Sequence, residues 1–399
     1  MKTKKYDGYR AYSYVEEGVD YEAFELAPEI GRVPAYDLDL TEEQQRRAQR
    51  LLDESIVISL HEHPVRFPTD MGQVFDYNRT ARQRTAYEGL SRSGLDAVID
   101  NFMDGTACVT STMGWKWNDV VFDLGMRLCD IAHQDFITVG QTVDDIVEAH
   151  DTGRLALIPG LEAATAIENE LDRIEILYGL GVRQMGIAYS EANALGSGLR
   201  EKGDGGLTDL GRRAVERMNK VGMAIDVSHS GDQTALDTIA VSERPVLITH
   251  AGARSIWNIK RMKPDEVIVA CAEKGGLIGL EAAPHTTVSP DHPRHSLDSV
   301  MDHFTYCVDL VGIENIGFGP DTLYGDHVGL HHAFAAHLSV RDMTAGPDFE
   351  RVEYVAGLEN PTECFPNIVG WLVKHGYSDE DIKGVIGGNA VRVLRNIWD

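Results

Sequence analysis

The chain has 399 residues, of which 43% are hydrophobic and 25% are charged, an ordinary composition for one large globular domain or two modest ones. Its formal net charge of −26 at pH 7 disfavours nucleic acid and anionic membrane surfaces as partners. The basic amino terminus lacks a following apolar stretch, and no segment has the length of a membrane span. We therefore expect a cytoplasmic protein that acts on a small molecule. The oligomeric state stays open, a homo-oligomer included.

The five cysteines are odd in number and widely spaced, and they form no Cys-x-x-Cys pair. This pattern indicates neither a disulfide framework nor a zinc knuckle. We expect all five to be reduced core residues: Cys108, Cys129, Cys271, Cys307 and Cys364.

Apolar runs alternate with helical patterns along most of the chain. A charged helix that Thr41 caps follows a polar leader, so residues 1–50 are predicted to be an N-terminal extension that packs on a domain formed by residues 51–399. Helices after Thr208 and after Pro264 have proper start signals and end at glycines. Eight strand–helix units predict an α/β fold, a (β/α)8 TIM-type barrel. The candidate strands are about 56–61, 105–111, 155–162, 182–188, 223–229, 245–250, 277–282 and 315–320.

Three connections are longer than a barrel requires, and they follow the first, seventh and eighth candidate strands. They cover residues 64–95, 285–297 and 322–348. Loops at the carboxyl ends of barrel strands usually shape a substrate pocket or a lid, although some pack against a partner subunit.

Potential metal ligands recur where these strands end. His61 and His63 are two residues apart on one strand, so their side chains point to the same face and can share an ion. Two later strands end in His229 and His250, and two others end in carboxylates. In a barrel, the carboxyl ends of the strands meet at one mouth. The set His61, His63, Glu162, His229, His250 and Asp321 therefore predicts a site for one or two zinc-type ions.

A single buried histidine is more often a hydrogen-bonded core or loop residue than a ligand. The repetition at strand ends, together with glutamate and aspartate, favours the metal site. Other histidines lie in helical or loop contexts, where we expect them only on the surface: His133, His150, His303 and His375.

The chain from residue 181 onward contains a series of short motifs. They are Gly181-Val-Arg, Gly206-Leu-Thr-x-x-Gly, Gly222-Met-Ala-Ile-Asp-Val-Ser-His229, Pro245-Val-x-x-x-His250-x-x-x-Arg254, Arg261-x-x-Pro-Asp265, Gly312-Ile-x-x-Ile-Gly-x-Gly-x-Asp321 and Gly387-Gly-Asn389. In their order and spacing these motifs resemble the membrane (renal-type) dipeptidase family, peptidase family M19, over roughly residues 50–399. The resemblance implies a metal-dependent barrel of the amidohydrolase superfamily with two zinc ions that cleave dipeptides.

The same resemblance implies a role for each candidate site residue. His61 and the residue two later would bind the first metal, Glu162 would bridge both metals, and the second metal would be held by His229 and His250. Asp321 would orient the bridging hydroxide and act as base and acid. Arg261 would bind the terminal carboxylate of the substrate, a role that suits a planar guanidinium.

Two positions depart from the family pattern. The first motif normally reads His-x-Asp, whereas this chain has His63 at the third place, which changes the first site by one negative charge. Such a change affects how tightly the metal is held, and it leaves one ion or another divalent metal open. Tyr189 stands where the family has a histidine that stabilises the tetrahedral intermediate. Its hydroxyl can donate a hydrogen bond to the substrate but carries no positive charge at neutral pH.

The favoured function is a zinc-dependent hydrolase that cleaves the amide bond of a dipeptide or dipeptide-like small molecule by metal-bound hydroxide. Asp321 and Tyr189 would be catalytic, and the substrate would carry a carboxylate. The alternative is a metal-dependent barrel enzyme for a non-peptide substrate, by cyclic amide or lactone hydrolysis or by decarboxylation. A third reading is a non-catalytic binding protein on the same barrel.

Overall fold

The computed structural model describes residues 4–102, 116–337 and 347–398. Eight parallel strands follow one another around the sheet, and a ninth, β5 (Ile137–Val139), pairs only with β6. In sheet order the eight are β1 (Ile58–Glu62), β4 (Ala97–Asn101), β6 (Leu155–Leu161), β7 (Gln184–Gly186), β8 (Ala224–Asp226), β9 (Val246–Ala251), β10 (Leu277–Leu280) and β11 (Ile316–Phe318).

The first and last strands of this sheet meet where they end. The backbone N–H of Asp321 donates to the carbonyl of His61 at 3.1 Å, and the N–H of His63 donates to the carbonyl of Thr322 at 2.9 Å. These bonds bring the segment after β11 beside β1, which closes the sheet. The predicted barrel is thus confirmed.

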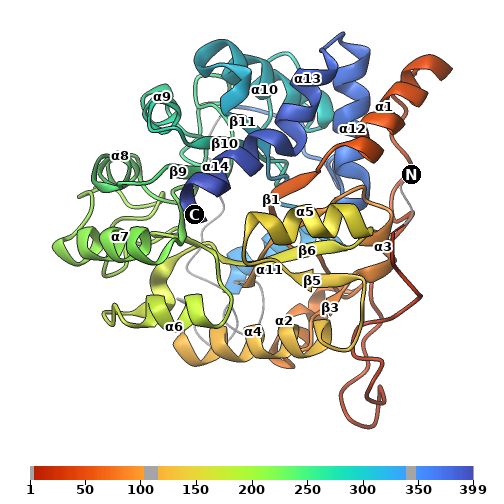
Figure 1. Ribbon diagram of the computed structural model, residues 1–399, viewed down its shortest axis with the longest axis horizontal. Helices are drawn as coiled ribbons and strands as arrows, with labels where there is room; N and C mark the ends of the chain where they lie inside the picture. Colours follow the sequence, from red (N-terminus) through yellow and green to blue (C-terminus); the bar gives the residue numbers. More distant parts are fainter. Residues whose placement is uncertain (1–3, 103–115, 338–346, 399) are drawn as a thin grey trace.

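Helices surround the sheet and follow most of its strands, as Figure 1 shows. Thr41 begins α1 with a capping box that includes Gln44, and Thr208 begins α7 by accepting from the N–H of Gly211. Gly222 ends α7 at φ +77°, a conformation that favours glycine. The outer helices are α1 (Glu42–Glu54), α4 (Trp117–Ile131), α5 (Val143–Thr152), α6 (Arg173–Gly179), α7 (Asp209–Val221), α8 (Asp232–Val241), α9 (Asp265–Glu273), α10 (Leu297–Val311), α12 (Pro361–Lys374), α13 (Asp379–Lys383) and α14 (Asn389–Trp398).

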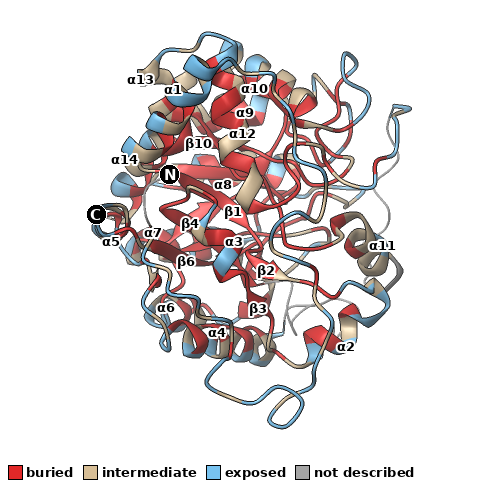
Figure 2. Cartoon of the chain, turned by 90° about the vertical axis from the view of Figure 1, so that its right-hand side faces the viewer, coloured by how far each residue is buried: buried red, intermediate tan, exposed pale blue. Residues whose placement is uncertain are grey.

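The barrel interior is apolar at the end opposite the predicted site. The last helix, α14, packs against the amino ends of the strands, and the indole N–H of Trp398 donates to the carbonyl of Arg183, just before β7, at 3.3 Å. Buried strands fill the centre of the molecule in Figure 2. The shared cluster includes Ile58, Leu60, Ile99, Ile158, Leu247, Leu277, Val393, Leu394 and Ile397. The predicted site lies at the opposite end of the barrel, at the carboxyl ends of the strands.

Two of the three long connections pack on each other beside that polar end. The connection after β1 contains β2 (Val65–Arg66), α2 (Val74–Arg79), β3 (Arg84–Thr85) and α3 (Tyr87–Ser91), and the connection after β11 contains α11 (His327–His337). Their shared apolar cluster is Val65, Phe67, Val74, Leu323 and Leu330.

The N-terminal segment runs along the barrel before α1. The ammonium of Lys4 lies 2.8 Å from a carboxylate oxygen of Asp96, and the hydroxyl of Tyr9 donates to Asp130 at 2.7 Å. The division at residue 50 stays a prediction.

Three sequence expectations need correction. The second barrel strand is β4, whereas the strand expected at 105–111 overlaps 103–115, which lies outside the described residues. His303 is buried rather than on the surface, and the pKa of that imidazole falls to about 4 because burial disfavours its charged form. His133 and His375 are exposed as expected, and the half-buried His150 lies 2.9 Å from an Asp96 oxygen.

The cysteines follow the expectation with one exception. Cys271, Cys307 and Cys364 are free and buried, but Cys129 is free and exposed on α4. Cys108 lies outside the described residues. Among the helices of the described ranges, none combines the length and the apolar character needed to cross a membrane.

Candidate metal centre

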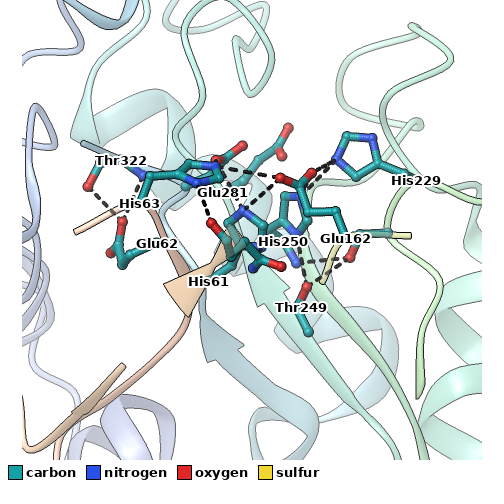
Figure 3. Close-up of polar contacts among 12 residues, drawn as sticks. His61, Glu62, His63, Glu162, His229, Thr249, His250, Glu281 and Thr322 are labelled. Atoms are coloured by element: carbon teal, nitrogen blue, oxygen red, sulfur yellow. Dashed lines mark hydrogen bonds and ion pairs between the residues drawn. The ribbon is translucent and has the colours of Figure 1, made fainter. Parts of the chain in front are cut away.

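The six predicted ligands meet at the carboxyl ends of the strands, as Figure 3 shows for five of them. His61 lies on β1 and His250 on β9, whereas the others lie within three residues after the ends of β1, β6, β8 and β11. All six side chains are buried. Three sets of three, each with its ligand atoms within 4.8 Å of one another, could hold an ion: His61, His63 and Glu162; His61, His250 and Asp321; and Glu162, His229 and His250.

Glu162 divides the histidines into two pairs. Its Oε1 lies 3.9 Å from Nε2 of His61 and 3.6 Å from Nε2 of His63. Its Oε2 lies 3.0 Å from Nε2 of His229 and 3.8 Å from Nε2 of His250. One carboxylate thus faces two histidine pairs with different oxygens, which is the arrangement that a bridging ligand between two ions requires.

Asp321 stands on the other side of the first pair. Its Oδ1 lies 3.3 Å from Nε2 of His61 and 3.2 Å from Nε2 of His63. The residue has φ +58°, an uncommon conformation for a residue other than glycine. Burial alone would raise the pKa of Asp321, but His61 and His63 hold that pKa well below its ordinary value. Asp321 is therefore a carboxylate that can accept a proton.

The hydrogen bonds behind the histidines leave their ligand nitrogens facing the cluster. Thr249 donates its hydroxyl proton to Asp226 at 2.8 Å, so its oxygen accepts the Nδ1 proton of His250 at 2.8 Å. This tautomer leaves Nε2 of His250 unprotonated. The side-chain amide of Asn101 lies 2.7 Å from Nδ1 of His61, and Nε2 of His61 has no hydrogen-bond partner among the described residues.

The charge state of the histidines also suits a metal. Burial lowers the pKa of His61, and it lowers the pKa values of His229 and His250 well below the ordinary value. Neutral imidazole is the form that binds a metal ion, and orientation by a hydrogen-bonded partner is typical of metal-bound histidine. Four imidazoles and two carboxylates therefore fit one or two divalent ions of the zinc type.

Tyr189 lies beside the second histidine pair. Its ring stacks on His229 with centroids 4.0 Å apart and an angle of 23° between the planes. Burial and the carboxylates of Glu162 and Asp321 raise the pKa of Tyr189 well above its ordinary value. The hydroxyl therefore stays protonated and can donate a hydrogen bond.

Arg261, expected to bind a substrate carboxylate, already contacts a carboxylate of the protein. Its guanidinium donates to Glu281 and, at 3.0 Å, to the carbonyl of His250. Arg261 is 2% exposed and Glu281 is fully buried. The sequence interpretation missed Glu281, although it ends the apolar run of β10 just as Glu162 ends that of β6.

Glu62 is a second acidic residue that the sequence interpretation missed. It lies between His61 and His63 on β1 and points to the opposite side, where it accepts from the backbone and hydroxyl of Thr322, both at 2.7 Å. It also accepts from Ser59 at 3.0 Å. Burial raises the pKa of Glu62 to about 8. A glutamate inside an otherwise apolar strand was the available signal.

Comparison with known proteins identifies the family. The sequence pattern of the membrane dipeptidase family (Peptidase family M19) matches residues 45–345 and 340–399. The chain is 28% identical over 280 residues to dipeptidase tcpJ of Claviceps purpurea, which covers 69% of this chain and 59% of that protein. It is 26% identical to dipeptidase 3 of Rattus norvegicus, over 62% of this chain and 46% of that protein. The chain thus matches about half to three fifths of the length of these two relatives.

Solved structures share the fold. An amidohydrolase from Pseudomonas aeruginosa superposes with a TM-score of 0.73 at 25% identity, covering 88% of this chain and 99% of that one. A metallopeptidase from Rhodobacter sphaeroides, solved with a phosphinate mimic of the dipeptide L-Ala-D-Ala, gives a TM-score of 0.66 at 18% identity, covering 86% and 100%. The chain therefore belongs to the membrane dipeptidase family, peptidase family M19.

Proposed function

We propose that the protein is a zinc-dependent hydrolase that cleaves the amide bond of a dipeptide or dipeptide-like small molecule. The position of Glu162 between two histidine pairs, with Asp321 beside the first pair, carries this proposal. Membership of the membrane dipeptidase family supports it.

Each ion would have its own histidine pair. His61 and His63 would hold the first ion, His229 and His250 would hold the second, and Glu162 would bind both. When bound, two zinc ions lower the pKa of a shared water to near neutrality and so make hydroxide available to attack an amide carbonyl.

Asp321 would act as the general base and then as the general acid of this reaction. Its carboxylate lies at the mouth of the barrel and is held in the charged form, so it can orient the attacking water and accept its proton. The same residue would then pass the proton to the leaving nitrogen. Substitution Asp321→Asn keeps the size of the side chain but removes the base, so we expect metal content to be retained and turnover to be lost.

Tyr189 would stabilise the negative charge that develops on the carbonyl oxygen. Its protonated hydroxyl supplies a hydrogen bond close to Glu162 and Asp321 without adding positive charge. The family resemblance puts a histidine at this place. In this chain a neutral tyrosine hydroxyl would stabilise the oxyanion instead.

The second candidate function keeps the metals and changes the substrate. His63 and Tyr189 differ from the family pattern at the first metal site and at the oxyanion position, which favours hydrolysis of a cyclic amide or a lactone.

A panel of dipeptides and their C-terminal amides, with L and D residues at the second position, tests the proposal on zinc-loaded protein with and without a chelator. Cleavage that the chelator abolishes supports dipeptide hydrolysis. If protein shown to hold stoichiometric metal cleaved no substrate of the panel, dipeptide hydrolysis would be contradicted. Cyclic amides and lactones would then be assayed. Zinc-loaded Asp321→Asn is the matched inactive control.

A further inference from the structure

The buried pair of Arg261 and Glu281 changes what the site can bind. A guanidinium that grips a carboxylate uses two parallel N–H donors on one edge. In this protein Glu281 accepts from one terminal nitrogen of Arg261, and the other donates to the carbonyl of His250 at 3.0 Å. Both terminal nitrogens of the arginine expected to hold a substrate carboxylate are therefore already bonded to the protein.

Glu281 belongs to the mouth of the barrel and not to its outer surface. It directly follows β10, and its N–H donates to the carbonyl of Ala251, the residue after His250, at 3.1 Å. The next residue, Ala282, donates its N–H to the carbonyl of Pro320, the residue before Asp321, at 2.8 Å. Glu281 thus lies between the strand ends that carry a second-pair histidine and the proposed base.

One oxygen of Glu281 can accept a further bond. Its Oε2 contacts Arg261, whereas its buried Oε1 has no partner at hydrogen-bonding distance among the described residues. The hydroxyl of Thr286 also acts on this carboxyl group, but it donates its proton to the carbonyl of Ala283 at 2.6 Å. A buried carboxylate oxygen without a donor is unfavourable, and an N–H group of a ligand would satisfy it.

We propose that Glu281 is a specificity-determining residue that makes the site select substrates with an uncharged group, such as a C-terminal carboxamide, at the end that meets Arg261. This inference rests on the proposed hydrolysis of dipeptide-like amides. A free substrate carboxylate would have to compete with Glu281 for the donors of one buried guanidinium. A carboxamide does not need this pair of donors and can donate its N–H to Oε1 of Glu281.

Arg200 is another cation in the neighbourhood. Both Arg200 and Arg261 act electrostatically on the hydroxyl of Tyr189. If Arg200 bound a substrate carboxylate, the pair formed by Glu281 and Arg261 would not restrict the substrate. The binding test separates these two cases.

The test measures binding, so that it does not depend on turnover. Zinc-loaded Asp321→Asn protein is titrated by calorimetry with alanyl-alanine and with its C-terminal amide, each with an L or D second residue. We expect the amide to bind at least about tenfold more tightly than the acid, a difference of about 1.4 kcal/mol. Adding Glu281→Gln should reverse the preference, because a carboxamide competes less strongly than a carboxyl group for the guanidinium of Arg261 and keeps the side-chain shape.

Glu359→Gln is the matched control, since Glu359 is a buried glutamate that contacts Arg32 outside the metal cluster. It should leave the preference for the amide unchanged. Tighter binding of the acid in the Asp321→Asn background alone overturns the role of Glu281 and leaves the proposed function standing, even where Glu281→Gln does not fold. A failure of both ligands to bind, with no hydrolysis by the parent protein, overturns both proposals.

Discussion

Two groups of buried histidines lie near the carboxyl ends of the strands, and they differ in how their nitrogens are used. In the metal centre, Nε2 of His61 lacks a hydrogen-bond partner in the described part of the chain, and Nε2 of His229 lies 2.9 Å from Nε2 of His250. Around the loop after β10, His303 accepts from the N–H of Ala253 at 3.0 Å and has its other nitrogen 2.9 Å from a carbonyl oxygen. His295 is likewise contacted at both nitrogens.

Burial therefore does not distinguish a ligand from a structural histidine. All of these imidazoles are buried, and burial lowers the pKa of each of them. What distinguishes the metal centre is that its histidine nitrogens face one another and the carboxylates of Glu162 and Asp321. Nitrogens bonded to the backbone fix a loop, whereas nitrogens that converge with carboxylates indicate an ion.

The strongest test substitutes one histidine of each group. His250→Ala removes a ligand of the proposed second ion, so we expect turnover to fall by about 10⁴-fold, equivalent to about 5 kcal/mol of transition-state stabilisation, together with metal content. His303→Ala should keep metal and turnover but lower the free energy of unfolding by about 1–3 kcal/mol, because the N–H of Ala253 loses its acceptor. Metal analysis, kinetics and urea unfolding measure these effects. Loss of metal from His303→Ala would contradict the distinction.

Tyr189 tests whether contact with a ligand histidine is structural or catalytic. Tyr189→Phe keeps the ring that stacks on His229 but removes the hydroxyl, so we expect kcat to fall by about 100-fold, or about 2.7 kcal/mol, with KM and metal content unchanged. Tyr306→Phe is the control, since the hydroxyl of Tyr306 donates to Asp265 on an outer helix. Full activity of Tyr189→Phe would reduce Tyr189 to a packing residue.

The structural histidines should also give the protein a pH dependence of stability. His303 has a pKa of about 4 when folded, below the value of about 6.5 for a free imidazole, so the unfolded chain binds more protons between these values. Stability is therefore present above pH 6.5 and is lost as the pH falls toward 4. From pH 7 to pH 5 this single group should remove about 2 kcal/mol.

A variant without the titrating group isolates this contribution. His303→Asn cannot gain a proton in this range, and its carboxamide oxygen can still accept a hydrogen bond. Urea unfolding of both proteins at pH 7 and pH 5 should show their stability difference shrinking by about 2 kcal/mol at the lower pH. A constant difference would mean that the pKa of His303 is the same in the folded and the unfolded protein.

The sequence was sufficient for most of the barrel because a buried parallel strand is a short apolar run between helices with clear start signals. Seven of the eight expected strands overlap strands of the barrel. The second barrel strand was missed because its apolar centre, Ala97–Ile99, is only three residues long and has Asp96 and Asp100 beside it. In the fold these aspartates are paired, with Lys4 and Arg127 respectively, and the partners lie far away in sequence.

The candidate site was predictable where it depends on strand periodicity and not where it depends on pairing. Spacing places His61 and His63 on one face, and topology brings the other strand ends to the same mouth. The contact between Arg261 and Glu281 joins a loop to the end of another strand, so no local sequence pattern predicts it. The burial of His303 was missed for the same reason, since its partner Ala253 comes from the loop after β9.

His63 offers the finest test, because it separates the two halves of the metal centre. The family resemblance puts aspartate at this place, and His63→Asp would add one negative charge near Glu162 and Asp321. We expect the first ion to be lost to a chelator about tenfold more slowly, or about 1.4 kcal/mol, while loss of the second ion is unchanged. His133→Asp makes the same charge change on an exposed surface and should alter neither rate. Equal slowing of both ions would mean that His63 acts through overall charge, since only a direct ligand changes one site and leaves its neighbour unaffected.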